Sequence, residues 1–372
     1  MKTIKITILV LLLANGTLFS QLLSIPCVAY RTDRIWNIAD DMGNILYQSN
    51  ILLDVETYSE GFLSGYAFDR DNVVSIYYKD DGVIELKTSS EKALKFKNNR
   101  AFVVSNISKN EKEPEYIFGI IDRRGNYILE KKWMDFSEYT EGLAYIMNKE
   151  ERGYVDTNGK FVFYLDSGVV GYGFYEGLSA VSNIIIDRFG YIDKTGKLVI
   201  DYKFYEAGQF SEGLARVFIP NKNTGRGGFG FINKNGILLI DNFYDETRTF
   251  NEGYNFVAIQ EPDGVAMRWQ IIDKDGSSKT ELIFADCKDF SESVAAVKRL
   301  NDIMWYYIDT TFNPISNKYK FCGSFKNGKA LVVDANDKKY FINKNSKLLF
   351  ELPANADIIL DCRTNEKYGE YK

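Results

Sequence analysis

The chain has 372 residues, a formal net charge of −5, and a composition that is 45% hydrophobic and 15% aromatic, which is typical of a folded, strand-rich protein. It contains no histidine, and this excludes Ser-His-Asp and Cys-His catalytic arrangements together with His-containing zinc sites. No basic cluster is present that could follow a phosphate backbone, so nucleic acid is not an expected partner.

The N-terminus reads as a signal peptide. Lys2 and Lys5 precede an apolar run over 6–14, and a polar segment over 15–20 ends at Ser20. We therefore expect 1–20 to be removed, leaving 44 basic and 51 acidic residues. The predicted destination is the periplasm, the cell surface or the medium, with peripheral or no membrane contact; an uncleaved anchor is the alternative.

The rest of the chain repeats one pattern, clearest over 189–218. An aromatic-Gly strand entry leads to a turn that starts with Asp and ends with Gly, such as Asp193 to Gly196, followed by a return strand. A second marker is an aromatic residue followed by Glu-Gly and a third strand, as in 210–217. The spacing between successive copies of this marker is 35 to 43 residues, which indicates a tandem repeat with variable loops.

These residues resemble the WG repeat, also called the KWG repeat, of bacterial proteins. The resemblance covers approximately Trp36 to Phe350, although the Trp-Gly pair is Phe-Gly or Trp-x here and Arg152 or Lys339 stands in the aromatic column of two copies. The resemblance implies an all-β repeat scaffold and no common enzymatic activity. It indicates one array over 21–372, with the best copies at 118–330 and degenerate copies at 27–100 and 331–372.

The predicted fold is all-β, with about nine three-stranded antiparallel units stacked face to face as an open or spiral propeller-like array. A possible fourth strand lies in the connection 202–210. A closed β-propeller is the alternative, but about nine units exceed the usual 4–8 blades.

The four cysteines are predicted to pack as small apolar side chains. Cys287 and Cys322 each lie three residues before the aromatic marker, where the clearest copy has Ala207, and Cys362 is expected in the same column. Cys27 is the one residue for which a bridge to a late cysteine stays open, if the array closes on itself.

Acidic residues recur at two repeat positions. The turn residues Asp122, Asp156, Asp193 and Asp273 are assigned to turn geometry, because a calcium loop would need further ligands. The ladder of Glu60, Glu141, Glu176, Glu212, Glu252 and Glu292 is assigned to backbone hydrogen bonds at the strand entries, with an acidic binding rim as the alternative.

Two groups of side chains are candidates for glycan chemistry. Trp133 lies outside the repeat's Trp/Phe column and, with Tyr172, Tyr202 and Tyr205, is a candidate exposed stacking platform. A hydrolase would need a pair of carboxylates outside the repeat columns, for which Glu113, Glu115 and Asp263 are the candidates.

The sequence thus predicts a non-enzymatic, exported scaffold that binds another envelope or extracellular protein along one rim. It indicates no catalytic, cofactor-binding or metal-binding residue and no cofactor. A carbohydrate-binding or carbohydrate-active protein is the alternative, and a purely structural envelope component is a third possibility.

Overall fold

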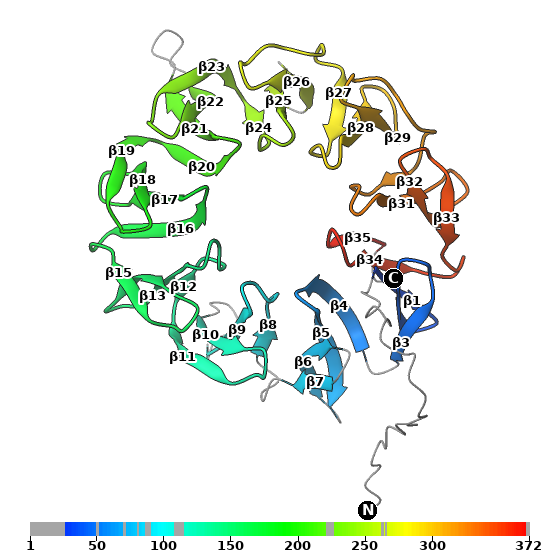
Figure 1. The fold of residues 1–372 in the computed structure, drawn as a ribbon, viewed down its shortest axis with the longest axis horizontal. Helices are drawn as coiled ribbons and strands as arrows, with labels where there is room; N and C mark the ends of the chain where they lie inside the picture. The colour runs from blue at the N-terminus through cyan, green and yellow to red at the C-terminus, as the bar shows by residue number, and fades with distance from the viewer. Residues whose placement is uncertain are drawn as a thin grey trace, which may run out of the picture.

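The computed structural model is built from small antiparallel sheets that stand side by side around a central opening (Figure 1). It describes residues 27–49, 52–69, 72–79, 82–85, 91–107, 115–220, 227–261, 264 and 266–369. The predicted signal peptide, Glu113 and Asp263 lie outside these ranges. Within them every regular element is a strand, and none is a helix that could cross a membrane.

The described strands form eight sheets, six of which have four strands in sequence order. The strands of the first three of these sheets are β4 (Leu52–Ser59), β5 (Phe62–Asp69), β6 (Asn72–Lys79), β7 (Gly82–Glu85); β8 (Glu91–Ala93), β9 (Arg100–Asn106), β10 (Tyr116–Asp122), β11 (Tyr127–Trp133); and β12 (Asp135–Phe136), β13 (Ala144–Met147), β14 (Arg152–Val155), β15 (Phe161–Tyr164). The strands of the other three are β16 (Val169–Tyr175), β17 (Leu178–Asn183), β18 (Arg188–Asp193), β19 (Leu198–Phe204); β20 (Glu206–Ser211), β21 (Leu214–Pro220), β22 (Gly227–Asn233), β23 (Leu238–Tyr244); and β30 (Phe321–Cys322), β31 (Lys329–Val333), β32 (Lys339–Asn343), β33 (Leu348–Glu351).

The remaining two sheets depart from this plan. A six-stranded sheet spans two repeat units. Its strands are β24 (Glu246–Thr247), β25 (Tyr254–Gln260), β26 (Met267–Asp273), β27 (Phe284–Cys287), β28 (Val294–Arg299) and β29 (Trp305–Asp309). The two units are joined where β26 pairs with β27 through one pair of opposite residues, Trp269 and Phe284. The last sheet combines both ends of the chain, and its strands are β1 (Val28–Thr32), β2 (Ile35–Ala39), β3 (Ile45–Ser49), β34 (Ile358–Asp361) and β35 (Glu366–Tyr368).

The first strand of a unit lies nearest the opening and the last strand at the periphery, as β16 with β19 and β20 with β23 show (Figure 1). The predicted fourth strand in the connection 202–210 is present as β20. Apolar side chains from facing sheets form the core between neighbouring units. One such cluster joins Tyr191 and Ile200 of one unit to Phe210 and Val217 of the next. The predicted stack of antiparallel repeat units is therefore confirmed.

Pairing between the two ends of the chain makes the stack a ring. β1 and β34 are antiparallel, with Val28 opposite Asp361, and the Cys362 amide donates to the Cys27 carbonyl at 2.9 Å. The pairing of β1 with β34 in one sheet is what the closed alternative expects, and the stacked all-β array itself is as predicted.

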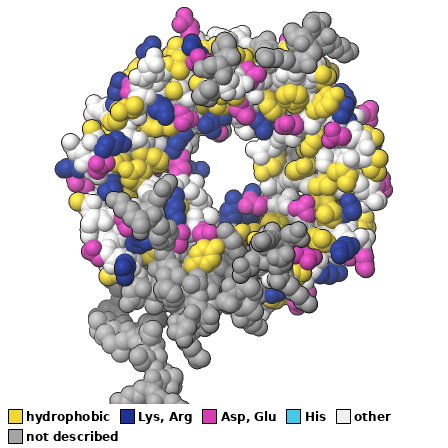
Figure 2. Space-filling view, turned by 180° about the vertical axis from the view of Figure 1, so that it is seen from behind, with side chains coloured by type: hydrophobic (Ala, Val, Ile, Leu, Met, Phe, Trp, Pro, Cys, Tyr) yellow, Lys and Arg dark blue, Asp and Glu magenta, His cyan; other side chains and the backbone are white. Residues whose placement is uncertain are grey.

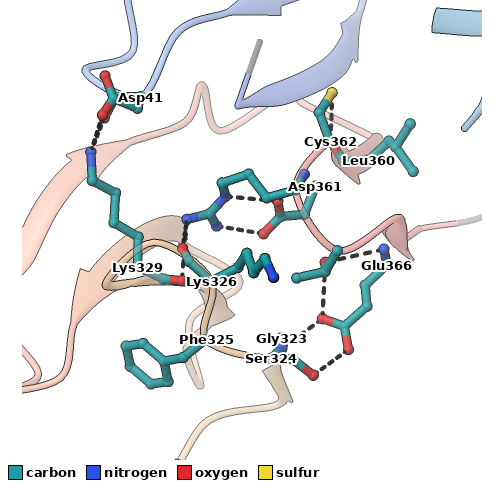
Figure 3. A network of polar contacts seen from close by, with 12 residues as sticks. Asp41, Gly323, Ser324, Phe325, Lys326, Lys329, Leu360, Asp361, Cys362 and Glu366 are labelled. Carbon is teal, nitrogen blue, oxygen red and sulfur yellow. Dashed lines mark hydrogen bonds and ion pairs between the residues drawn. The ribbon is translucent and has the colours of Figure 1, made fainter. Parts of the chain in front are cut away.

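A buried ion pair sits at this closure (Figure 3). The Asp361 carboxylate is fully buried and accepts from Arg363 Nε at 2.9 Å. The same guanidinium donates from Nη1 to the carbonyls of Lys326 and Lys329 in the neighbouring unit, at 2.7 and 3.2 Å. Lys329 in turn reaches the Asp41 carboxylate at 2.8 Å. Arg363 therefore links the turn between β34 and β35 to the unit of β30–β33.

β35 adds a further strand on the channel side of the closing sheet and contacts two neighbouring units (Figures 1 and 3). Its Glu366 carboxylate accepts from the Ser324 amide at 2.6 Å and from Lys288 Nζ at 2.9 Å. The C-terminal hairpin thus ties the closing sheet to the units of β27–β29 and β30–β33.

Candidate partner-binding surface

The Asp turns have the geometry expected of turns. Asp193 Oδ1 accepts from the amides of Thr195 and Lys197 at 2.9 and 3.1 Å, and Gly196 closes the turn with φ of 84°. The equivalent turns at Asp122, Asp156 and Asp273 use the same contacts. These carboxylates serve their own turns, and the described residues contain no group of three Cys, Asp or Glu side chains that could hold a metal ion.

The Glu ladder has a structural role that extends beyond its own turn. Each Glu-Gly pair forms a tight turn in which Glu has φ between 50° and 57° and the following residue also has positive φ. Asn is usually favoured at a turn position with positive φ, which explains why Asn98 and Asn327 replace Glu in two of the degenerate repeats. Glu is present because its carboxylate reaches the turn of the next unit.

The contacts between turns repeat from unit to unit. Glu176 accepts from the Gly213 amide at 3.0 Å, Glu212 from the Gly253 amide at 2.9 Å, and Glu292 from the Gly328 amide at 2.8 Å. Glu60, Glu141 and Glu252 make the equivalent contacts. The ladder is therefore a belt of hydrogen bonds that links the units, and the assignment of these residues to backbone hydrogen bonds is confirmed and extended.

Lysines of the following unit neutralise part of this belt. Lys194 lies 2.9 Å from Glu141, and Lys234 lies 3.0 Å from Glu176. Partial burial alone would raise the pKa of these two carboxyls. Hydrogen bonds from the lysines and the backbone amides outweigh burial, so each pKa lies below its usual value. The Glu141 and Glu176 carboxylates of this belt are therefore bonded to amides and lysines of the next unit and do not form an unpaired acidic surface.

The aromatic platform does not form as predicted. Trp133 is 2% exposed and packs against Phe161, with ring centroids 5.8 Å apart. It pairs across the strands with Phe118, as Phe204 does with Phe189 and Tyr244 with Phe229. The prediction was wrong because this second aromatic column, fifteen residues after the first, was not recognised.

The tyrosines of that proposed platform have different environments. Tyr172 and Tyr205 are exposed, and the Arg188 guanidinium stacks on Tyr205 at 3.7 Å from the ring centroid. Tyr202 is half-buried and packs against an inter-unit core. Of the candidate hydrolase carboxylates, Glu115 lies within the described residues, whereas Glu113 and Asp263 lie outside them.

All four cysteines are free and buried, as the packing interpretation expects. Cys27 lies opposite Cys362 in the closing sheet, but the two belong to different apolar clusters. Burial raises the pKa of Cys27 and of Cys287 to about 12. We expect no thiol to react with Ellman's reagent in native protein at pH 8 and all four to react in denaturant, because only the thiolate is nucleophilic. Reaction in the native state would contradict this packing.

A surface that the sequence analysis missed lies on the loops between second and third strands. Each Glu-Gly turn joins the first and second strands of its unit, so antiparallel pairing places these turns on one face of the ring and the loops between second and third strands on the other, here called the loop face. On the loop between β17 and β18, Ile184, Ile185 and Ile186 are 63%, 76% and 51% exposed. Ile303, between β28 and β29, is 87% exposed.

The conformation of the triple-isoleucine loop is fixed by local contacts. Asn183 Oδ1 accepts from the Ile185 amide at 3.0 Å, and the Ile184 amide donates to the Gly168 carbonyl at 2.9 Å. A Cβ on Gly168 would come within 2.8 Å of Ile185, so the glycine leaves the room that this side chain uses. Three adjacent apolar residues at a loop position, between Asn183 and Asp187, are the sequence signal that identifies this surface.

Figure 2 shows a central channel with Lys, Arg, Asp and Glu side chains around its edge and hydrophobic side chains scattered farther out. The ring therefore offers two different kinds of surface. The edge of the channel is charged, whereas the loop face carries exposed isoleucines.

Comparison with solved structures shows a shared fold. The crystal structure of a eukaryotic initiation factor matches with a TM-score of 0.61 and 10% identity, covering 92% of this chain and 96% of that chain. BamB from Moraxella catarrhalis matches with a TM-score of 0.43 and 9% identity, over 77% and 95% of the two chains. The β-propeller domain of a Pyrococcus furiosus protease matches with a TM-score of 0.39 and 12% identity, over 72% and 97%. At these identities the likeness concerns the fold alone.

No curated protein matches the chain. The family model described as "WG containing repeat" matches residues 189–222, 271–302 and 305–340. These stretches contain the Asp turns and Glu-Gly turns described above. Three stretches of the chain therefore match the WG containing repeat, within a propeller-like ring of antiparallel sheets.

Proposed function

We propose that this protein is an exported, non-catalytic scaffold that binds another protein through its loop face. The observation that carries the proposal is the loop of Ile184, Ile185 and Ile186, which holds three apolar side chains in water in a fixed conformation. Exposed apolar groups that are grouped and preorganised are typical of protein interaction sites, since binding removes them from water without a large ordering cost.

The position of this loop in the ring supports the same proposal. The loop is not required for the inter-unit core, because its side chains point into solvent while β17 and β18 supply the buried residues of that unit. Repeat arrays commonly vary such loops while keeping the scaffold constant. A protein with complementary apolar groups is therefore the occupant that we propose.

The test is affinity capture from the native cell envelope, with protein starting at Gln21 as bait. Replacing Ile184, Ile185 and Ile186 by serine should reduce capture of the specific partner at least tenfold and leave the melting temperature unchanged. The matched control is Ile237→Ser, which changes a 56% exposed isoleucine on a turn of the opposite face. Equal capture by the triple variant and the parent protein would overturn the proposal, as would recovery of polysaccharide without protein.

A further inference from the structure

Three consecutive units contribute residues to a pocket beside β20 and β24. It is lined by Gly208, Arg216, Thr247, Arg248, Phe250 and Asp289 and has a volume of about 430 Å³. The pocket is separate from the triple-isoleucine loop, which belongs to the unit of β16–β19. Its size is sufficient for one small polar molecule.

Two guanidinium groups supply hydrogen-bond donors to this pocket. Arg216 Nη1 donates to Glu246 Oε1 at 2.8 Å and to the Thr247 carbonyl at 3.1 Å. Arg248 donates only through Nε, to Cys287 Sγ at 3.4 Å, among the described residues. Its nearest carboxylates, Asp286 and Asp289, are each 3.9 Å away, beyond good hydrogen-bond distance. The terminal nitrogens of Arg248 therefore remain available for a planar anionic group.

A buried hydroxyl in the pocket has no partner. Thr247 is 4% exposed, and its Oγ1 makes no hydrogen bond to the described residues. Thr247 occupies the repeat column that holds Ala207, Cys287 and Cys322 in other units, so packing at this position does not require a hydroxyl. An unpaired buried hydroxyl costs stability, and a ligand that bonds to it would account for its presence.

Asp289 adds an acceptor to the pocket lining, with Oδ1 3.9 Å from Arg248 Nε. Its Oδ1 is buried and has no hydrogen-bond partner among the described residues. Burial raises the pKa of this carboxyl, against the opposing charge of Arg248. A ligand that carries both an anionic group and hydroxyl donors would satisfy Arg248 and Asp289 together, whereas a fully ionised phosphate would offer no donor.

The floor of the pocket restricts the ligand further. The apolar residues that line the pocket are Leu214, Phe231 and Phe250. Each is at least nine-tenths buried, so a bound ligand would contact little apolar surface. The geometry points to a binding site for an acidic sugar, a uronic acid unit, with its carboxylate at Arg248 and its hydroxyls toward Thr247 and Asp289. This inference is independent of protein binding by the loop face.

The test is isothermal titration calorimetry of the protein from Gln21 with glucuronate, glucose and inorganic phosphate, each used separately. Glucuronate should bind at least tenfold more tightly than glucose or phosphate. Arg248→Gln should weaken glucuronate binding at least tenfold, whereas Arg188→Gln, an arginine on the loop face, should leave it unchanged.

Thr247→Val is the more discriminating variant. It should weaken glucuronate binding about three- to tenfold while leaving the melting temperature equal or higher, because it removes an unpaired buried hydroxyl. A purely structural threonine would show no effect on binding. The proposal is overturned if glucuronate does not bind, if glucose or phosphate binds as tightly, or if neither pocket variant changes the affinity.

Discussion

Replacing Arg363 with methionine is expected to lower the free energy of unfolding by about 3–5 kcal/mol. The substitution leaves the Asp361 carboxylate buried without its cation and removes two hydrogen bonds to the neighbouring unit. Because these contacts lie where the two ends of the chain meet, the loss should open the ring at the closing sheet. Urea unfolding followed by tryptophan fluorescence measures the effect.

The pH dependence of this loss distinguishes a buried charge from simple loss of packing. Burial raises the pKa of Asp361 in the folded state, and Arg363 opposes this rise. Without the arginine the folded-state pKa should rise further, so the folded protein takes up a proton more readily than the unfolded chain. The deficit of the variant should therefore be largest at pH 8 and smaller at pH 5.

Lys338→Met is the matched control for the arginine substitution. Lys338 is 60% exposed and lies 3.7 Å from Glu351, so its removal should cost no more than about 1 kcal/mol. A loss for Arg363→Met that is equally small, or independent of pH, would contradict the role assigned to the buried pair.

Replacing Glu176 with alanine is expected to lower the free energy of unfolding by about 1–2 kcal/mol at pH 7. The change removes an acceptor for the Gly213 amide and the ion pair with Lys234, both in the next unit. The lower end of this range reflects the partial exposure of both charged groups. Chemical denaturation of the variant, beside that of Glu130→Ala on the exposed side of β11, measures the belt's contribution.

Acid should abolish the difference between Glu176→Ala and the parent protein. The folded-state pKa of Glu176 lies below its unfolded value, because hydrogen bonds and Lys234 outweigh burial. Its stabilisation is therefore present above the unfolded pKa of about 4.3 and is lost as pH falls through the folded pKa. A difference that persists undiminished in acid would show that the carboxylate charge is not responsible.

The repeat features with short-range causes were predictable from the sequence. Asp193 and Gly196 form a turn through contacts within five residues, so their identities predict the structure directly. The small buried column of Ala207, Cys287 and Cys322 could likewise be recognised from its fixed distance to the next aromatic residue.

Features that depend on contacts between units were harder to predict. Glu176 reaches an amide 37 residues away, and only the stacking of units reveals that distance to be short. The pairing of Val28 with Asp361 joins the chain ends, and no local pattern indicates that the ring closes there. Trp133 is a different case, because it pairs with Phe118 within its own sheet and the fifteen-residue spacing of that second aromatic column is present in the sequence.

The loop-face proposal is tested most directly by hydrogen–deuterium exchange of the captured complex. The account predicts slower exchange for a peptide covering 183–187 when the partner is bound, with little change at the Glu-Gly turns on the opposite face. Slower exchange confined to those turns or to the channel strands, with 183–187 unaffected, would contradict it.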